Sequence, residues 1–138
     1  MILVDTNVFS ELQRTTPDNR VVDWLHAHKD ETLLSAVVIG EFKLGICLTP
    51  GARKRELLSA WLDRLVELHT GERTVPFDTS AALRYGEIIA ALQRQWRSAD
   101  VHDGQIAAQA LTLGCPIATR NAKHFRYEGI ELVDPWTT

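Results

Sequence analysis

Three acidic side chains, Asp5, Glu41 and Asp103, occupy positions where the local pattern otherwise favours a hydrophobic residue or a strand end. Burying one unpaired carboxylate costs several kcal/mol, and three that converge without a lysine or arginine also repel one another. A divalent cation removes both penalties. A set of carboxylate oxygens suits Mg²⁺, with Mn²⁺ as a substitute, whereas zinc prefers histidine or cysteine. The residue types therefore predict a magnesium site.

Glu41 lies in segment 37–48, which has the pattern of an amphipathic helix. Val37, Leu44 and Leu48 form an apolar stripe at i, i+7 and i+11, and Glu41 occupies the position that completes it. We therefore expect this carboxylate to face the core. The alternative is a partly exposed Glu41 on a helix that is rotated differently.

Asp103 begins a second helical segment, 103–113, one turn before Ile106 and Ala107. It thus shares the face that must pack against a sheet. Asp100 competes for the same role, but it precedes the helix, where an acidic side chain turns back to cap the helix amides. We expect Asp100 to be the cap and Asp103 the metal ligand. The alternative places Asp103 third in a capping arrangement begun by Asp100.

Asp5 follows directly after the apolar run 1–4, which has the pattern of a strand. In open α/β sheets, ligands bind beyond the carboxyl ends of the strands, near the point where strand order reverses. Asp5 is therefore a candidate ligand, and Thr6 beside it is a candidate contact through its hydroxyl or its amide. Both also have a simpler interpretation as caps of the short helix expected at 8–12.

The rest of the chain alternates between strand-like and helix-like segments. Strands are predicted at 1–4, 32–36, 74–77, 116–119 and 130–133, and helices at 8–12, 21–28, 37–48, 53–69, 80–96, 103–113 and 122–125. Pro76 cannot donate to a strand ladder, so we expect 74–77 at a sheet edge. Alternating strands with long helical crossovers predict an α/β fold, a parallel sheet with helices on both faces.

Length and composition are those of one globular domain spanning 1–138, with 45% hydrophobic and 24% charged residues among 138. No apolar run approaches the ~18 residues of a membrane span, and the first residues lack a secretory pattern, so we expect a cytoplasmic protein without a membrane partner. We expect Cys47 and Cys115 to be reduced and buried, and the four tryptophans to be core or rim residues. The net charge of −3 is unusual for a nucleic-acid binder. If three acids hold a metal, however, the remaining acidic and basic residues are equal in number.

Several segments together resemble the successive motifs of PIN domains, and specifically of VapC-type toxins. They are DTN at 5–7, SAVVIGEFKLGI around Glu41, DGQIAAQA from Asp103, and TRNAKHF at 119–125. The closing EGIELVDPW resembles the FitB-like branch of that family. The similarity extends from residue 1 to about 136, with the motifs in order.

This resemblance implies a three-layer PIN fold, in which helices flank a central five-stranded parallel sheet. It also implies a divalent metal held by Asp5, Glu41 and Asp103, and a Mg²⁺-dependent endoribonuclease that forms the toxin of a bacterial type II toxin-antitoxin system. Many family members have a fourth acid where this chain has Asn121. An amide is a weaker, neutral ligand, so the number of metal ions stays open.

The resemblance further implies three partners: an RNA substrate, a cognate antitoxin protein and a second copy in a homodimer. Arg120 and Lys123 flank Asn121, so both are candidates to contact RNA phosphates, with an exposed surface role as the alternative. Trp24 or Trp61 are candidates to line an antitoxin groove.

Phosphodiester hydrolysis requires an activated water and a group that stabilises developing negative charge, and a carboxylate-held metal supplies both. We therefore expect in-line attack by water without a covalent enzyme intermediate. A non-catalytic PIN-like module that binds RNA or protein is the alternative, favoured by Asn121 and by the acidic balance. A phosphohydrolase or nucleotide-binding domain is disfavoured, because neither glycine-rich phosphate loop, GxGxxG or GxxxxGK[ST], is present.

Overall fold

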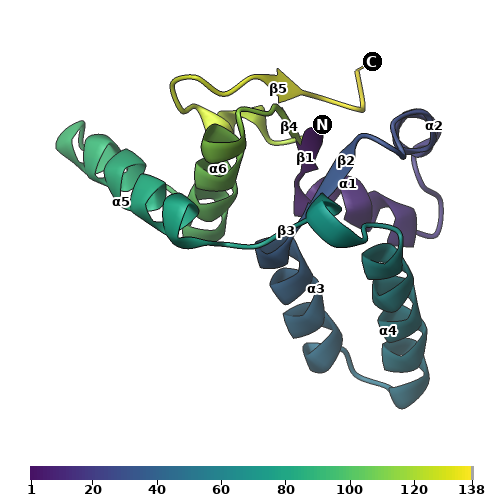
Figure 1. Ribbon diagram of the computed structural model, residues 1–138. Helices are drawn as coiled ribbons and strands as arrows, with labels where there is room; N and C mark the ends of the chain where they lie inside the picture. Colours follow the sequence, from purple (N-terminus) through teal and green to yellow (C-terminus); the bar gives the residue numbers. More distant parts are fainter. Residues whose placement is uncertain (138) are drawn as a thin grey trace.

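The computed structural model describes residues 1–137 and contains one sheet of five parallel strands (Figure 1). The strands are β1 (Ile2–Val4), β2 (Thr32–Ser35), β3 (Thr74–Val75), β4 (Ile117–Ala118) and β5 (Leu132–Val133). Their order is β3-β2-β1-β4-β5, so the chain builds outward on one side of β1 and then crosses to the other side. The strand order therefore reverses beside β1, between β1 and β4. This is where an α/β sheet opens a ligand site at its carboxyl edge.

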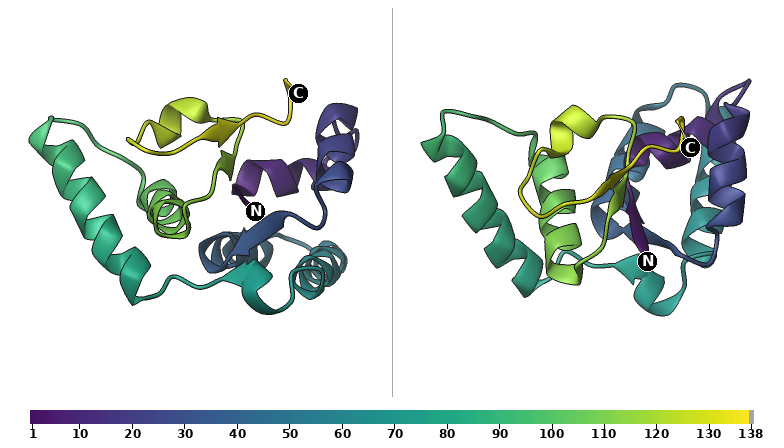
Figure 2. Two further views of the ribbon diagram at one scale, coloured as in Figure 1. Left: turned by 45° about the horizontal axis from the view of Figure 1, so that its top comes forward. Right: turned by 90° about the horizontal axis from the view of Figure 1, so that it is seen from above.

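Within residues 1–137, six α-helices flank the sheet, as the sequence pattern predicted; Figures 1 and 2 show their arrangement. They are α1 (Thr6–Ser10), α2 (Asn19–Ala27), α3 (Ala36–Leu48), α4 (Ala52–Glu67), α5 (Thr79–Arg94) and α6 (Val101–Leu113), with 3₁₀ turns η1 (Glu11–Gln13), η2 (Gly71–Arg73) and η3 (Ala122–Phe125). Figure 1 shows α5 extending away from the sheet beside α6. Across residues 1–137, no helix combines the length and apolar character needed to span a bilayer.

Short polar side chains fix where the helices begin. The N-cap side chains that accept a hydrogen bond from a first-turn amide are those of Asp5, Asp18, Ser35, Asp78 and Asp100. Each satisfies one of the amides that lack a partner at a helix start. Asp100 accepts from the amides of His102 and Asp103, which confirms its predicted role as a cap.

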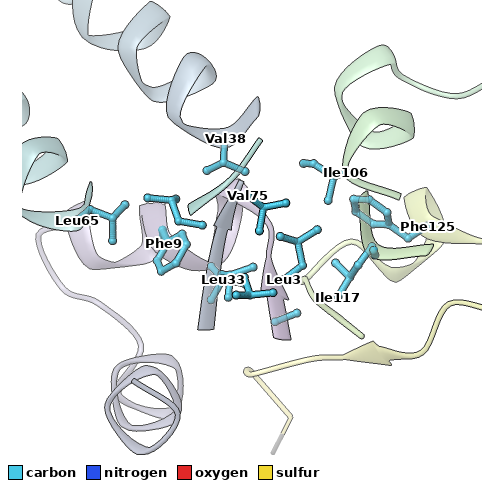
Figure 3. Packing of buried hydrophobic residues seen from close by; sticks show 14 of the residues in the cluster. Leu3, Phe9, Leu33, Val38, Leu65, Val75, Ile106, Ile117 and Phe125 are labelled. Atoms are coloured by element: carbon cyan, nitrogen blue, oxygen red, sulfur yellow. The ribbon is translucent and has the colours of Figure 1, made fainter. Parts of the chain in front are cut away.

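The core is built around the central strand β1. Leu3 and Val4 of β1 are fully buried, as are Ile106 of α6 and Ile117 of β4, and Figure 3 shows Leu3, Ile106 and Ile117 together with Val38 of α3. Burial on both faces explains why β1 lacks polar alternation. β3 lies at the sheet edge and ends before Pro76, in agreement with the sequence-based prediction.

Helix α5 packs closely against α6. A Cβ atom at Gly104 would lie 3.0 Å from side-chain atoms of both Tyr85 and Ile89, so the absence of a side chain at this position lets the two helices approach. The α6 segment that carries Asp103 is thereby covered by α5 on one side.

The predicted rotation of α3 was wrong. Leu44 and Leu48 are 57% and 74% exposed, whereas Val38 and Ile46 are buried against the sheet and α4. The core face of α3 is thus the row at i, i+4 and i+8 from Val38. This row differs from the predicted stripe because α3 packs on α4 as well as on the sheet. Cys47 follows Ile46 on the outer side and is exposed, contrary to its predicted burial.

The four tryptophans differ in their environments. Trp24 and Trp136 are buried, and Trp61 is half-buried with its ring edge-on to Phe42 at 5.0 Å between centroids. Trp96 is 98% exposed, so its assignment to the core or rim was wrong. It follows the last turn of α5 with φ of 56°, a backbone conformation that directs its side chain into solvent.

Candidate functional site

Asp5 stands at the carboxyl end of β1, beside β4, at the reversal of strand order. Its backbone amide donates to the Ala118 carbonyl at 2.9 Å, which continues the β1–β4 ladder to the position of the carboxylate. Oδ1 of Asp5 accepts from the Thr6 amide at 2.8 Å. The side chain is 5% exposed, and burial raises its pKa despite the hydrogen bonds that lower it. Asp5 therefore caps α1 and also faces the site.

A buried threonine holds the other carboxylate oxygen of Asp5. Thr119 Oγ1 donates to Asp5 Oδ2 at 2.9 Å, and the Asn7 side-chain amide donates to the same oxygen at 3.1 Å. The Thr119 hydroxyl also accepts a hydrogen bond from the backbone amide of Asn121 at 3.0 Å, so this one hydroxyl links β4, Asp5 and the residue before η3. The sequence analysis did not identify Thr119 or Asn7 as site residues. The available signal was a threonine at the end of a strand expected beside the first one.

Glu41 reaches the site from α3. Its side chain is 26% exposed, and its Oε1 lies 3.9 Å from Nδ1 of His102. Burial is the main cause that raises the Glu41 pKa, and the negative charges of Asp5 and Asp103 raise it further. Glu41 is thus partly exposed on a helix that is rotated differently from the prediction, and the charges of the other two acids reach it.

Asp103 reaches the site from the first turn of α6. Its side chain is 20% exposed, and its Oδ2 lies 3.4 Å from Nδ1 of His124. Burial, followed by the charges of Asp5 and Asp100, raises its pKa to about 6. The structure thus places His102 beside Glu41 and His124 beside Asp103.

The donor set at this edge of the sheet fits a divalent cation. Among residues 1–137, Asp5, Glu41 and Asp103 form no ion pair with lysine or arginine, and their negative charges meet only histidine rings. The buried Thr6 hydroxyl lies beside Glu41 and lowers the pKa of that carboxyl, but no hydrogen bond of normal geometry links it to another group among residues 1–137. Three raised carboxylate pKa values and an unpartnered buried hydroxyl are expected where a cation would neutralise the charge.

The three acids do not form a closed set around one point among residues 1–137. Within the part of the chain that the structure describes, no three side chains of histidine, cysteine, aspartate or glutamate are grouped closely enough to hold a metal ion by themselves. Mutual repulsion between carboxylates favours such separation.

The remaining predicted residues follow β4. Asn121 immediately precedes η3. Its side chain does not cap that turn, and its backbone amide donates to Thr119 Oγ1. The Arg120 guanidinium lies over the Trp136 ring, 4.9 Å from its centroid. Lys123 lines a cavity of about 190 Å³ together with Asp103 and His124. Of the two predicted phosphate contacts, the geometry favours Lys123.

These features define a class: an α/β protein with a cluster of acids at the switch point of a five-stranded parallel sheet. The model of the PIN domain matches residues 2–130, and the chain belongs to the PIN domain family. It is 34% identical over 137 residues to VapC ribonuclease Y4jK of Sinorhizobium fredii, covering 99% of this chain and 98% of that protein. It is 33% identical to toxin FitB of Neisseria gonorrhoeae, covering 99% of both.

Solved structures agree with this assignment. The crystal structure of FitAcB from Neisseria gonorrhoeae superimposes with a TM-score of 0.91 at 33% identity, over 100% of both chains. VapBC2 from Rickettsia felis, bound to a DNA fragment from the promoter, superimposes with a TM-score of 0.82 at 22% identity, covering 96% of this chain and 98% of that one. The second similarity supports the fold alone. The predicted fold and family are thus confirmed.

Proposed function

We propose that this chain is a Mg²⁺-dependent endoribonuclease and the toxin of a bacterial type II toxin-antitoxin system. The observation that supports the proposal is that Asp5, Glu41 and Asp103, which follow β1 or lie on α3 and α6, are near enough for the charges of Asp5 and Asp103 to raise the pKa of Glu41, while none of the three pairs with a lysine or arginine among residues 1–137. Relatives named VapC ribonuclease and toxin FitB, both above 30% identity along nearly the whole chain, support the same activity.

In this proposal Asp5, Glu41 and Asp103 hold the cation, with Mn²⁺ as a substitute for Mg²⁺. When bound, the cation supplies Lewis acidity toward a phosphate and lowers the pKa of water. Thr119 and Asn7 keep the Asp5 carboxylate oriented through their hydrogen bonds to Oδ2. Thr6 offers its unpartnered hydroxyl beside Glu41.

Other residues act on the RNA. Lys123, on the wall of the cavity beside Asp103, is placed to hold an RNA phosphate, and Arg120 contributes more remotely. The Asn121 side chain, free of a capping role, is available to orient a water or a phosphate oxygen. Attack by water in line with the leaving oxygen needs no nucleophilic side chain.

The proposed partners are a cognate antitoxin protein and a second copy of the chain in a homodimer. Solved relatives include structures described as toxin-antitoxin complexes or as members of toxin-antitoxin systems, and these share the fold. The exposed leucines Leu44 and Leu48 on α3 provide an apolar surface that such a partner can cover. Trp61 of α4 is half-buried, with its ring edge-on to Phe42 of α3.

The test combines metal binding with RNA cleavage. Wild-type protein is incubated with single-stranded RNA in Mg²⁺ or in chelator, and Asp5→Asn and Asp103→Asn proteins are compared by calorimetric titration with Mn²⁺. We expect cleavage only with the metal, and loss of both cleavage and ion binding in the variants. RNA that is bound but never cut by the metal-loaded wild type would establish the non-catalytic alternative instead.

A further inference from the structure

A groove next to the acidic site is lined by two arginines that no acid neutralises. It consists of two adjoining cavities of about 190 and 480 Å³, and both are lined by Leu92, Arg97, Arg126 and Tyr127. Asp103 lies on the wall of the smaller cavity. The walls come from α5 between Arg84 and Leu92, the segment that joins α5 to α6, the first turn of α6, and η3 with the residues that follow it. We call this feature the arginine groove.

Acids also line the arginine groove, Asp100 and Asp103 in the smaller cavity and Glu87 and Glu128 in the larger one, but within residues 1–137 none of them forms an ion pair with the two arginines. Arg97 and Arg126 are exposed, and within residues 1–137 neither lies within 4.0 Å of a carboxylate oxygen. Other arginines do have such partners, namely Arg14, Arg20, Arg64 and Arg84. In a protein of net charge −3, two free guanidinium groups beside the same pocket form a local attraction for an anion.

The floor of the groove is suited to a nucleobase. Leu92 is buried there, and the Tyr127 hydroxyl oxygen is buried without a hydrogen-bond partner in the described chain. A tyrosine hydroxyl is protonated at neutral pH, so that of Tyr127 is a donor for a ligand in the groove. Guanidinium groups that contact phosphate, together with an aromatic ring and an unused donor, are the combination by which proteins bind single-stranded nucleic acid.

We propose that the arginine groove binds the nucleotide adjacent to the scissile phosphate of single-stranded RNA, with Arg97 and Arg126 on phosphate oxygens and Tyr127 against the base. The proposal rests on the proposed function, because it takes the site of Asp5, Glu41 and Asp103 as the point of cleavage. The combined volume of the cavities suits a nucleotide that leaves the stack, and a duplex would not present its bases to Tyr127.

The test measures binding without cleavage. A short fluorescein-labelled single-stranded RNA of mixed sequence is titrated with protein in chelator, and fluorescence anisotropy gives Kd over a series of salt concentrations. The variant is Arg97→Gln with Arg126→Gln. The matched control is Arg53→Gln with Lys54→Gln, which removes the same charge from exposed positions at the start of α4, on the far side of α3 from the groove (Figure 1).

We expect RNA affinity to fall by about tenfold or more in the groove variant and by less than about twofold in the control. The slope of log affinity against log salt should decrease by roughly 0.7 for each lost phosphate contact. In cleavage assays with Mg²⁺, the groove variant should raise KM more than it lowers kcat. Thermal midpoints should stay unchanged, because both arginines are exposed.

Several outcomes would overturn the proposal: no RNA binding by the wild type, equal affinity in the groove variant, or an equal loss in the control. A change in oligomeric state of the groove variant, with RNA affinity intact, would identify the groove as a protein interface instead. A wild type that never cleaves RNA, yet binds it through the two arginines, would remove the nuclease proposal and leave the groove as an RNA site.

Discussion

The hydroxyl of Ser35 donates a 2.6 Å hydrogen bond to the amide oxygen of Gln109, joining the start of α3 to α6. Gln109 is buried, and its amide nitrogen donates to the carbonyls of Val75 at 3.2 Å and Pro76 at 3.1 Å. Ser35 at the same time caps α3 through the Val37 amide. The two helices that carry Glu41 and Asp103 are therefore fixed to each other and to β3 by one side chain.

Replacing Gln109 by leucine should destabilise the protein and loosen the site. The change leaves the hydroxyl of Ser35 and the carbonyl of Val75 without a partner in the core, which costs about 2 to 4 kcal/mol. Urea unfolding measures the loss, and Mn²⁺ titration should show weaker binding in the folded variant. Gln93→Leu, at an exposed position of α5, is the matched control and should change stability by less than about 0.5 kcal/mol. Equal stability of the two variants would contradict this role of Gln109.

Removing the charge of Asp103 should stabilise the metal-free protein. Its folded pKa of about 6 lies above the ordinary value of 3.8, so the folded state binds more protons than the unfolded state between these pH values. Stability should therefore fall as pH rises from about 4 to 6 and stay low above that range. Asp103→Asn should recover about 1 to 2 kcal/mol at neutral pH, a value reduced for the partial exposure of the carboxylate.

The measurement for Asp103 is urea unfolding in chelator across this pH range. Asp63→Asn, which removes a charge from an exposed position of α4, is the control and should leave the pH dependence unchanged. Adding Mn²⁺ should reverse the order, so that the wild type becomes the more stable protein. A wild type more stable than Asp103→Asn without metal would show that the carboxylate is structurally satisfied, contrary to its proposed role.

Thr119 should act as a positioning residue for Asp5. Thr119→Val keeps the shape but removes the hydroxyl that donates to Asp5 Oδ2. The Asp5 pKa should rise further, and Mn²⁺ affinity should fall by about tenfold, the equivalent of one lost hydrogen bond to a charged group. Thr119→Ser restores a hydroxyl and should recover most of the affinity. If the serine variant binds metal as weakly as the valine variant, the packing of Thr119, rather than its hydrogen bond, is what matters.

Much of this arrangement was predictable from local patterns. Asp5 was placed by the end of an apolar strand, and Asp103 by its phase on an amphipathic helix with Asp100 as cap. Such features depend on periodicity and capping, which act within a few residues. The predicted strand at 74–77 was likewise located correctly at the sheet edge.

Contacts between distant segments were not predictable in the same way. Thr119 contacts Asp5 across 114 positions, and Gln109 contacts Ser35 across 74, so nothing in either local pattern marks them. The rotation of α3 was wrong because Leu44 and Leu48 belong to a face that the single chain leaves exposed. An apolar stripe shows that a face is to be covered, but it does not say whether the cover is the protein's own core or another chain.

Trp96 should carry backbone strain that glycine relieves. It stands just after the end of α5 with φ of 56°, and the next amide, that of Arg97, donates to the Leu92 carbonyl at 2.9 Å. This is the left-handed helix ending at which glycine is preferred. Trp96→Gly should raise the unfolding free energy by about 0.5 to 1 kcal/mol in urea. Trp96→Ala keeps the strain and should leave stability near that of the wild type, since the ring is exposed. Equal stabilisation by both variants would attribute the effect to the indole ring.

His69 should make the protein less stable in mild acid. The buried ring donates from Nδ1 to the Leu65 carbonyl at 2.8 Å, and its Nε2 lies 3.0 Å from the Thr32 hydroxyl, which donates to it when the ring is neutral. Burial, and then the nearby Arg73 charge, lower the His69 pKa. The unfolded state therefore takes up a proton near pH 6.5 while the folded state does not.

The neutral His69 ring therefore contributes its full share of the unfolding free energy above about pH 6.5. This contribution decreases as pH falls below that value. In urea unfolding between pH 5 and 7, His69→Gln should remove this slope, whereas His26→Gln, at an exposed position of α2, should preserve it. Carrying out both series in the Asp103→Asn background separates the two groups, because the Asp103 contribution has the opposite sign. If His69→Gln lost stability between pH 7 and 5 as steeply as the parent protein, protonation of His69 would not be the cause of that loss.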